Sequence, residues 1–217
     1  MDIARIDAAL ATGHLTEHEW YERIRDLLET AYLAADDPQR QSGLNGDGAH
    51  WERRRQVIVE AIDHDGSFLD VGCANGLLME TITAWVEARG HHLEPWGLDI
   101  SPKLAALART HLPMWSDRIF VGNVMAWEPP QRFDYVRTEL VYVPQPRQSE
   151  LVSRLLNRMV APGGRLIACA YRPSGAKDAE SIGVLLRSWG FTVDGEVAAN
   201  DMDGGVATRV VWTEALS

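Results

Sequence analysis

The chain has 217 residues, of which 46% are hydrophobic, enough to bury one core. Its net charge of −10 should repel a phosphate backbone, so we expect no nucleic-acid partner. The two cysteines, Cys73 and Cys169, match no zinc or CxxC spacing, which predicts no metal and a reducing compartment. No apolar stretch approaches a membrane span and the N-terminus lacks a signal-peptide pattern, so we expect a soluble, cytoplasmic protein with no membrane partner.

The first 64 residues predict a helical extension. Residues 16–33 predict an amphipathic helix, because Thr16 and Glu19 match a capping box ahead of apolar residues at helical spacing. Residues 36–50 contain a proline and three glycines and predict a loop, either a lid over a ligand or a plain solvent loop. Residues 51–62 predict a second helix. We therefore expect a helical cap and lid over 1–64 and the main domain over 65–217.

Beyond residue 64, short apolar runs alternate with helical stretches. The runs lie at 68–71, 93–98, 118–121, 135–136 and 165–170, and the helical stretches at 77–88, 103–112, 150–160 and 179–189. This alternation predicts a mostly parallel sheet covered on both faces, a Rossmann-like, doubly wound α/β fold. Two further runs, GFTVDGEV and VATRVVWTEAL, flank the turn-rich sequence NDMDGG and predict a C-terminal antiparallel edge hairpin.

The first predicted strand leads into the loop DVGCANG, residues 70–76. In a doubly wound sheet, ligands bind at the carboxyl ends of the strands. The second and third glycines of the dinucleotide fingerprint are replaced by Ala74 and Leu77, and Asp70 would repel a pyrophosphate. The loop therefore favours a cationic ligand without phosphate over a nicotinamide dinucleotide.

The same loop resembles motif I of the class I S-adenosylmethionine-dependent methyltransferases, usually D-x-G-x-G-x-G. GLDISPKLAALA places Asp99 at the position of the family's ribose-binding acid, and Ser101-Pro102 should cap the next helix. RIFVGNVMAW places Asn123, where an aspartate is common, and Val124 at the adenine. FDYVRTELVYVP resembles the fourth strand with its active-site loop, and VAPGGRLIA the turn into the fifth. The resemblance covers roughly residues 65–170.

The resemblance implies S-adenosyl-L-methionine as cofactor, S-adenosyl-L-homocysteine as product and a small-molecule acceptor. Methyl transfer from a sulfonium is an in-line displacement with a neutral leaving group, so alignment supplies most of the acceleration. Where the acceptor carries a proton, a base must remove it. The candidates for that acid–base or orienting role are Glu139, Tyr142 and His50. The residues assigned to the cofactor are Asp70, Gly72, Cys73, Ala74, Asn75, Gly76, Asp99, Ile100, Asn123, Val124, Arg137 and Thr138.

Several assignments have a second interpretation. Asp70 could brace the loop, Asn123 could be an ordinary turn residue, and Glu139 could bond a backbone amide. Arg137 and Thr138 could frame either the methionine end of the cofactor or a carboxylate on the substrate. We interpret Arg53, Arg54 and Arg55 as a solvated helix face, and Trp51 and Trp127 as residues that could line a pocket.

Two other functions remain open. One is a non-catalytic cofactor-binding subunit or sensor on the same fold, and the less favoured one is an NAD(P)-dependent oxidoreductase. The sequence leaves open which atom is methylated, which acceptor carries it, and whether the protein is a monomer or a homodimer.

Overall fold

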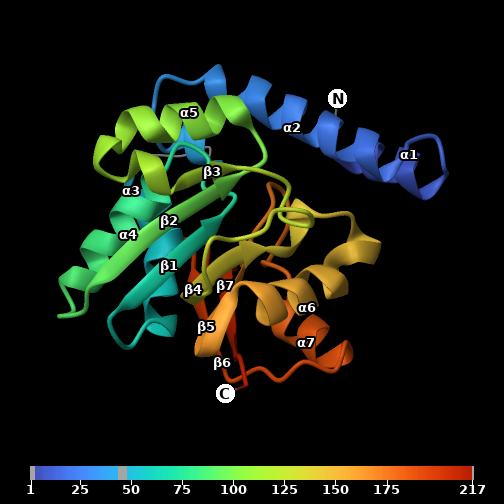
Figure 1. Cartoon of the computed structure of the whole chain (residues 1–217). Coiled ribbons are helices and arrows are strands. Elements are labelled where there is room, and N and C mark those ends of the chain that lie inside the picture. The colour runs from blue at the N-terminus through green and yellow to red at the C-terminus, as the bar shows by residue number, and fades with distance from the viewer. Residues whose placement is uncertain (1–2, 44–47, 217) are drawn as a thin grey trace.

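The computed structural model of the chain describes residues 3–43 and 48–216. Within them, seven strands form one sheet in the order β3-β2-β1-β4-β5-β7-β6 (Figure 1). Strands β1 to β5 are parallel, whereas β7 runs antiparallel to both β5 and β6. This confirms the predicted fold and its edge hairpin. The strands are β1 (Gly66–Val71), β2 (Leu93–Asp99), β3 (Ile119–Val121), β4 (Phe133–Glu139), β5 (Val160–Tyr171), β6 (Gly195–Asn200) and β7 (Val206–Glu214).

Helices cover both faces of this sheet. On one face pack α4 (Leu77–Glu87) and α5 (Pro102–His111), and on the other α6 (Gln148–Arg158) and α7 (Ile182–Ser188) (Figure 1). Successive side chains of β1 enter opposite cores, since Phe68 packs with the α4 side and Leu69 with the α6 side. Burial on both faces explains why the strands appear in the sequence as continuous apolar runs.

Several predicted boundaries need correction. β4 begins two residues before the predicted run and ends three after it, because it continues through the polar residues Arg137 to Glu139. Val160 starts β5 instead of ending the preceding helix. The predicted helix over 179–189 is shorter and forms only α7. Short 3-10 turns, η3 (Pro113–Arg118), η4 (Leu140–Tyr142) and η5 (Gln145–Arg147), complete the connections.

Two N-terminal helices cross above the carboxyl ends of the strands (Figure 1). The predicted helix is α2 (Glu17–Leu33), and its capping box is present: Thr16 accepts a hydrogen bond from the amide of Glu19, whose carboxylate accepts from the amide of Thr16 at 2.7 Å. Helix α1 (Ile3–Ala11) was not predicted, and it packs on α2 where Trp20 Nε1 donates to Asp7 at 2.8 Å.

The segment before β1 differs most from its prediction. The predicted loop over 36–50 contains a 3-10 turn, η1 (Arg40–Ser42), and the start of α3 (Gly48–Arg55). Residues 44–47, which belong to the predicted lid, lie outside the described residues. The predicted helix over 51–62 is divided into the end of α3 and the 3-10 helix η2 (Gln56–Ala61).

The predicted environments of two α3 side chains were wrong. Arg54 and Arg55 are buried, with 7% and 5% of their surface exposed, and do not form a solvated face. Arg54 Nη2 donates to the backbone carbonyls of Arg172 and Ala207. Trp51 is only 1% exposed, and its lining of a pocket stays a prediction. Among the residues that the structure describes, no helix combines the length and hydrophobicity needed to span a membrane.

We predict that Ser101→Ala lowers the free energy of unfolding by about 1 to 3 kcal/mol. The buried Ser101 hydroxyl caps α5 by accepting from the amide of Leu104 at 3.0 Å, and it donates to Glu29 on α2 at 2.6 Å. Ser181→Ala is the matched control, since Ser181 precedes α7 without a side-chain cap bond, and should change stability by less than about 0.5 kcal/mol. Equal losses in urea unfolding would contradict this account of the α2–α5 contact.

Candidate functional site

The loop after β1 makes a tight turn that only part of its sequence favours. Gly72 and Gly76 adopt left-handed backbone angles, with φ of 79° and 82°. Ala74 does the same, with φ of 47°, which is unusual for a residue that carries a Cβ and costs about 1 kcal/mol. The amides of Gly72 and Cys73 both donate to the carbonyl of Leu98, so the loop is tied to the end of β2. The turn therefore holds its backbone close to the carboxyl edge of the sheet.

Asp99, at the end of β2, faces the same loop. Its carboxylate accepts from the amides of Ala74 and Ser101, both at 2.8 Å, and the residue is 6% exposed. Burial raises the pKa of Asp99 to about 6, although the two amide donors oppose that shift. Each carboxylate oxygen keeps a second lone pair, so Asp99 can brace the loop and still accept from two ligand hydroxyls. The predicted capping of the following helix is performed by Ser101 itself.

Asp70 is buried at the end of β1, beside Arg137 of β4. Arg137 Nη1 donates to Asp70 Oδ1 at 3.2 Å, whereas Oδ2 has no hydrogen-bond partner among the described residues. Burial raises the pKa of Asp70 to about 6, and the Arg137 charge acts in the opposite direction. A buried carboxylate oxygen without a donor is costly, so it marks a position where a cationic donor would be stabilised.

Arg137 joins the ends of β1, β4 and β5 through what we call the Arg137 network, formed by Asp70, Arg137, Glu139, Tyr142 and Tyr171. Its Nη1 donates to the hydroxyl of Tyr142 at 3.0 Å, and its Nη2 donates to Glu139 and, at 3.2 Å, to Tyr171. Glu139 also accepts from the Tyr142 hydroxyl at 2.7 Å. Burial holds the pKa of Tyr142 well above its usual value, so its hydroxyl stays protonated and donates a hydrogen bond to Glu139.

Tyr142 covers the glycine loop, and Tyr32 lies close to the charged groups beside it. A methyl group on Gly72 would lie 2.5 Å from Cζ of Tyr142, so the Tyr142 ring rests directly on the loop. Tyr32, at the end of α2, is half-buried; burial raises its pKa to about 12, and the nearby charges of Glu139 and Asp99 add to the shift. The sequence placed Tyr32 only on the apolar face of a helix. Asn75, assigned to the cofactor, donates to the carbonyl of Pro38 at 2.8 Å and ties the loop to the segment that follows α2.

The remaining candidates are spread along the same edge of the sheet or beyond it. Asn123 Oδ1 accepts from the amide of Met125 at 2.9 Å, the geometry of an ordinary turn, so the adenine contact stays a prediction. His50 lies 3.5 Å from Asp201, beyond β6. Thr138, Cys73 and Val124 are buried, and Ile100 is half-buried. The structure thus groups Glu139 and Tyr142 in one network and pairs His50 with Asp201, outside that network.

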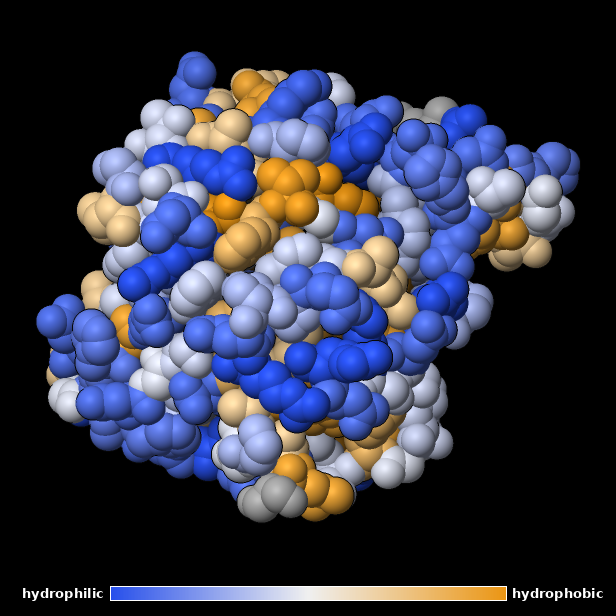
Figure 2. Space-filling model, viewed as in Figure 1, coloured by the Kyte–Doolittle hydropathy of each residue, from blue (hydrophilic) through white to orange (hydrophobic). Residues whose placement is uncertain are grey.

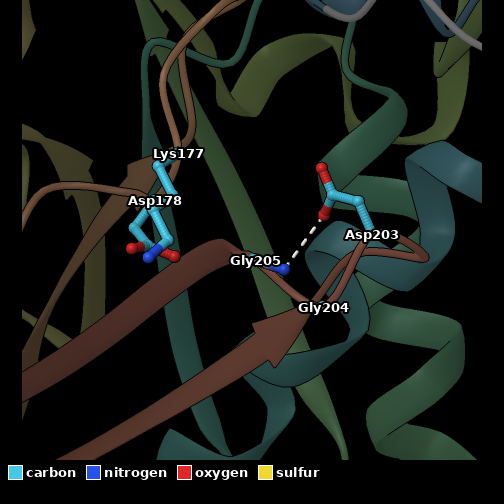
Figure 3. A pocket seen from close by; sticks show the side chains of 5 residues that line it. All are labelled: Lys177, Asp178, Asp203, Gly204 and Gly205. Carbon is cyan, nitrogen blue, oxygen red and sulfur yellow. Dashed lines mark hydrogen bonds between the residues drawn. The ribbon is translucent and has the colours of Figure 1, made fainter.

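The face in Figure 2 and the hollow in Figure 3 show no second candidate for a nucleoside site. Polar side chains cover most of the face in Figure 2, and apolar ones gather around the edge strand β3, where Val121 is 40% exposed. A hollow of about 230 Å³ lies by the β6–β7 turn, lined by Lys177, Asp178 and residues 203–205 (Figure 3). It contains no predicted site residue and no aromatic wall for a nucleoside. In the ranges 3–43 and 48–216, no group of three or more His, Cys, Asp or Glu side chains could hold a metal ion.

Comparison with known proteins agrees with this arrangement. The sequence model of a family described as "Methyltransferase domain" matches residues 68–164. The fold is similar to N-methyltransferase NodS from Bradyrhizobium japonicum in complex with S-adenosyl-L-homocysteine, with a TM-score of 0.67, 18% identity, and coverage of 89% of this chain and 98% of that one. No curated protein sequence matches the chain.

Two further solved structures share the fold. One is the 1,6-didemethyltoxoflavin-N1-methyltransferase of Burkholderia thailandensis with bound 1,6-didemethyltoxoflavin and S-adenosylhomocysteine, at TM-score 0.65 and 18% identity, covering 94% of this chain and 92% of that one. The other is the [4+2]-cyclase SpnF, at TM-score 0.61 and 16% identity, covering 89% and 95%. The same fold therefore occurs in proteins described by different reactions.

We predict that Gly72→Ala destabilises the protein more than Gly90→Ala, by about 1 to 3 kcal/mol. Both glycines have positive φ, but a methyl group on Gly90 meets nothing within 4 Å, whereas one on Gly72 meets the Tyr142 ring. Urea unfolding measures the difference. In a Tyr142→Ala background the excess should disappear, leaving the common backbone cost of about 1 kcal/mol. An excess that survives there would show that Tyr142 does not cover the loop.

Proposed function

We propose that this chain, whose residues 68–164 form a methyltransferase domain of the class I type, transfers the methyl group of S-adenosyl-L-methionine to a small-molecule acceptor. One observation carries the proposal: a glycine turn lies between two buried carboxylates, Asp70 and Asp99, at adjacent strand ends. Such a site suits a cationic nucleoside, and its charge opposes a diphosphate.

The residues present fit this cofactor. Asp99 would accept from the ribose hydroxyls, and the unpartnered Oδ2 of Asp70 would accept from the ammonium group. The left-handed backbone at Gly72 and Gly76 lets the main chain approach the ligand closely. Asn123 and Val124 would contact the adenine, and the apolar surface around β3 supports that placement (Figure 2).

The sulfonium supplies an activated methyl group, so the protein's main task is to align the acceptor and exclude water. Glu139 is the strongest candidate for orienting an acceptor or receiving its proton, because it lies at the end of β4 beside Arg137, the ion-pair partner of Asp70. It already accepts from Arg137 and Tyr142, which fix its orientation. We infer that Tyr142 acts as a donor in this group and that His50 has a structural role beside Asp201.

Three observations support a small acceptor. The net charge of −10 disfavours nucleic acid, and the similar Burkholderia enzyme is described with 1,6-didemethyltoxoflavin bound. In addition, α1 and α2 lie above the strand ends, where a cap would enclose a small substrate (Figure 1). Residues 1–64 are accordingly proposed as the segment that builds the acceptor site.

A non-catalytic cofactor-binding protein is the second candidate. It is favoured by the Tyr142 ring resting on Gly72. Incubation with methyl-labelled S-adenosyl-L-methionine and a small-metabolite extract separates the two, since only a transferase moves label to a metabolite. A complex that binds the cofactor with its sulfur sealed from any acceptor would favour the second candidate.

We predict that S-adenosyl-L-homocysteine binds with a Kd on the order of 10⁻⁶ M in titration calorimetry and that NAD does not bind. Asp99→Ala should weaken this binding by about 1.5 to 3 kcal/mol through the loss of charge-assisted hydrogen bonds. Asp65→Ala, which removes the same charge ahead of β1 at the opposite edge of the sheet, should leave the affinity unchanged. Unchanged affinity in Asp99→Ala would exclude the ribose assignment.

The affinity should also depend on pH. Because the pKa of Asp99 is raised to about 6, its carboxylate becomes protonated as the pH falls from 7 to 5 and loses its full capacity to accept from the ribose. Protonation of Asp99 alone should lower the affinity by up to about tenfold over this range, and protonation of Asp70, whose pKa is also raised to about 6, should add to the fall, whereas aspartates with ordinary pKa values would produce almost no change. The Asp99→Asn variant should bind S-adenosyl-L-homocysteine more weakly at pH 7, and its affinity should change less with pH. A flat wild-type profile down to pH 5 would argue against an ionised Asp99 as the ribose acceptor.

A further inference from the structure

Arg55 occupies an unusual position at the end of α3. Its guanidinium carbon lies 4.6 Å from the ring centroid of Trp51 and 4.7 Å from that of Tyr171, so the charge rests against two aromatic rings. The residue is 5% exposed. Tyr171 ends β5 and belongs to the Arg137 network, which places Arg55 at the carboxyl edge of the sheet.

The hydrogen bonding of Arg55 is incomplete. Nη2 donates to the carbonyl of Ser42 at 3.0 Å, whereas the buried Nη1 has no partner among the described residues. Among the described residues, Arg55 also forms no ion pair with a carboxylate. A buried guanidinium without a counter-charge is costly, so this position favours an anion.

The other two arginines around Tyr171 are better satisfied. Arg137 pairs with both Asp70 and Glu139. Arg54 donates to two backbone carbonyls, and its pKa is lowered first by burial and then by the adjacent Arg55 charge. Arg54 and Arg55 thus both lack a carboxylate partner among the described residues, and each has one buried nitrogen without an acceptor, but Arg55 makes fewer hydrogen bonds.

The strand order indicates which part of a bound complex would meet Arg55. The residues assigned to the cofactor follow the strand order, from the adenine to the amino-acid end. They are Asn123 after β3, Asp99 on β2 and Asp70 on β1. Tyr171 ends β5, two strands beyond β1, which at about 4.8 Å per strand is roughly 10 Å further along the edge. Arg55 thus lies beyond the methionine end of the proposed cofactor position, on the side left for the acceptor.

We propose that Arg55 binds a carboxylate of the methyl acceptor, which makes the acceptor a small organic acid. This inference rests on the proposed function. The planar guanidinium, held between Trp51 and Tyr171, presents parallel N–H donors that match a carboxylate. An incoming carboxylate would replace the one described hydrogen bond of Arg55, to the carbonyl of Ser42, and would also accept from the unpartnered Nη1.

Ligand-observed NMR on the protein saturated with S-adenosyl-L-homocysteine tests this assignment. The probes are benzoate, phenylacetate and succinate, each paired with its neutral carboxamide. At least one carboxylate should bind at least tenfold more tightly than its amide, and Arg55→Met should remove that preference. Arg53→Met, which removes an exposed arginine from the same helix, is the matched control and should retain it. Should Arg55→Met fail to fold, Arg55→Lys keeps the charge without the fork and should lower the preference at least threefold.

The result that overturns the proposal is a protein that binds S-adenosyl-L-homocysteine but shows no carboxylate preference, or one that Arg55→Met leaves intact. A second contradicting result uses 5′-methylthioadenosine, which lacks the amino-acid end. If Arg55→Met weakens S-adenosyl-L-homocysteine tenfold but spares this nucleoside, Arg55 holds the cofactor's own carboxylate. Failure of the wild-type protein to bind S-adenosyl-L-homocysteine would instead contradict the proposed function, so the two failures are distinguishable.

Discussion

The ion pair between Arg137 and Asp70 is the constraint on which the site depends. Both residues are almost fully buried, at 3% and 1% exposure, and they join neighbouring strands at the edge where the glycine loop turns. Two charges removed from water are tolerated only when each has partners, and Arg137 gains them from Glu139, Tyr142 and Tyr171. Asp70 Oδ2 and Arg137 Nε still have no hydrogen-bond partner among the described residues, so the ion pair is only partly satisfied.

This arrangement links ligand binding to the position of Tyr142. The ring covers Gly72 and its hydroxyl joins Arg137 to Glu139, so a ligand that reaches the loop backbone must move the ring. A cationic group beside Asp70 would compensate by supplying the missing donor. The acidic side chains at the ends of β1 and β2 disfavour a diphosphate for the same reason that they favour an ammonium group.

Local sequence patterns predicted the features that depend on neighbouring residues. The Thr16 capping box and the Ser101 cap both follow from residue types at fixed spacing. The alternation of apolar runs was sufficient for the sheet, because each strand is buried on both faces. The sequence also grouped Asp70 with Asp99 correctly at one edge, since parallel strands end on the same side.

What the sequence could not provide depends on contacts between distant segments. Arg54 and Arg55 belong to a polar, basic run, and only the packing of α3 against Tyr171 and the carbonyls of Arg172 and Ala207 buries them. The one local signal was Trp51, one helical turn before Arg55. The most direct test of the account is a crystal structure with S-adenosyl-L-homocysteine. We expect ribose hydroxyls on Asp99, the ammonium at Oδ2 of Asp70 and the Tyr142 ring displaced from Gly72; a ligand bound elsewhere, with Asp70 still facing only Arg137, would contradict it.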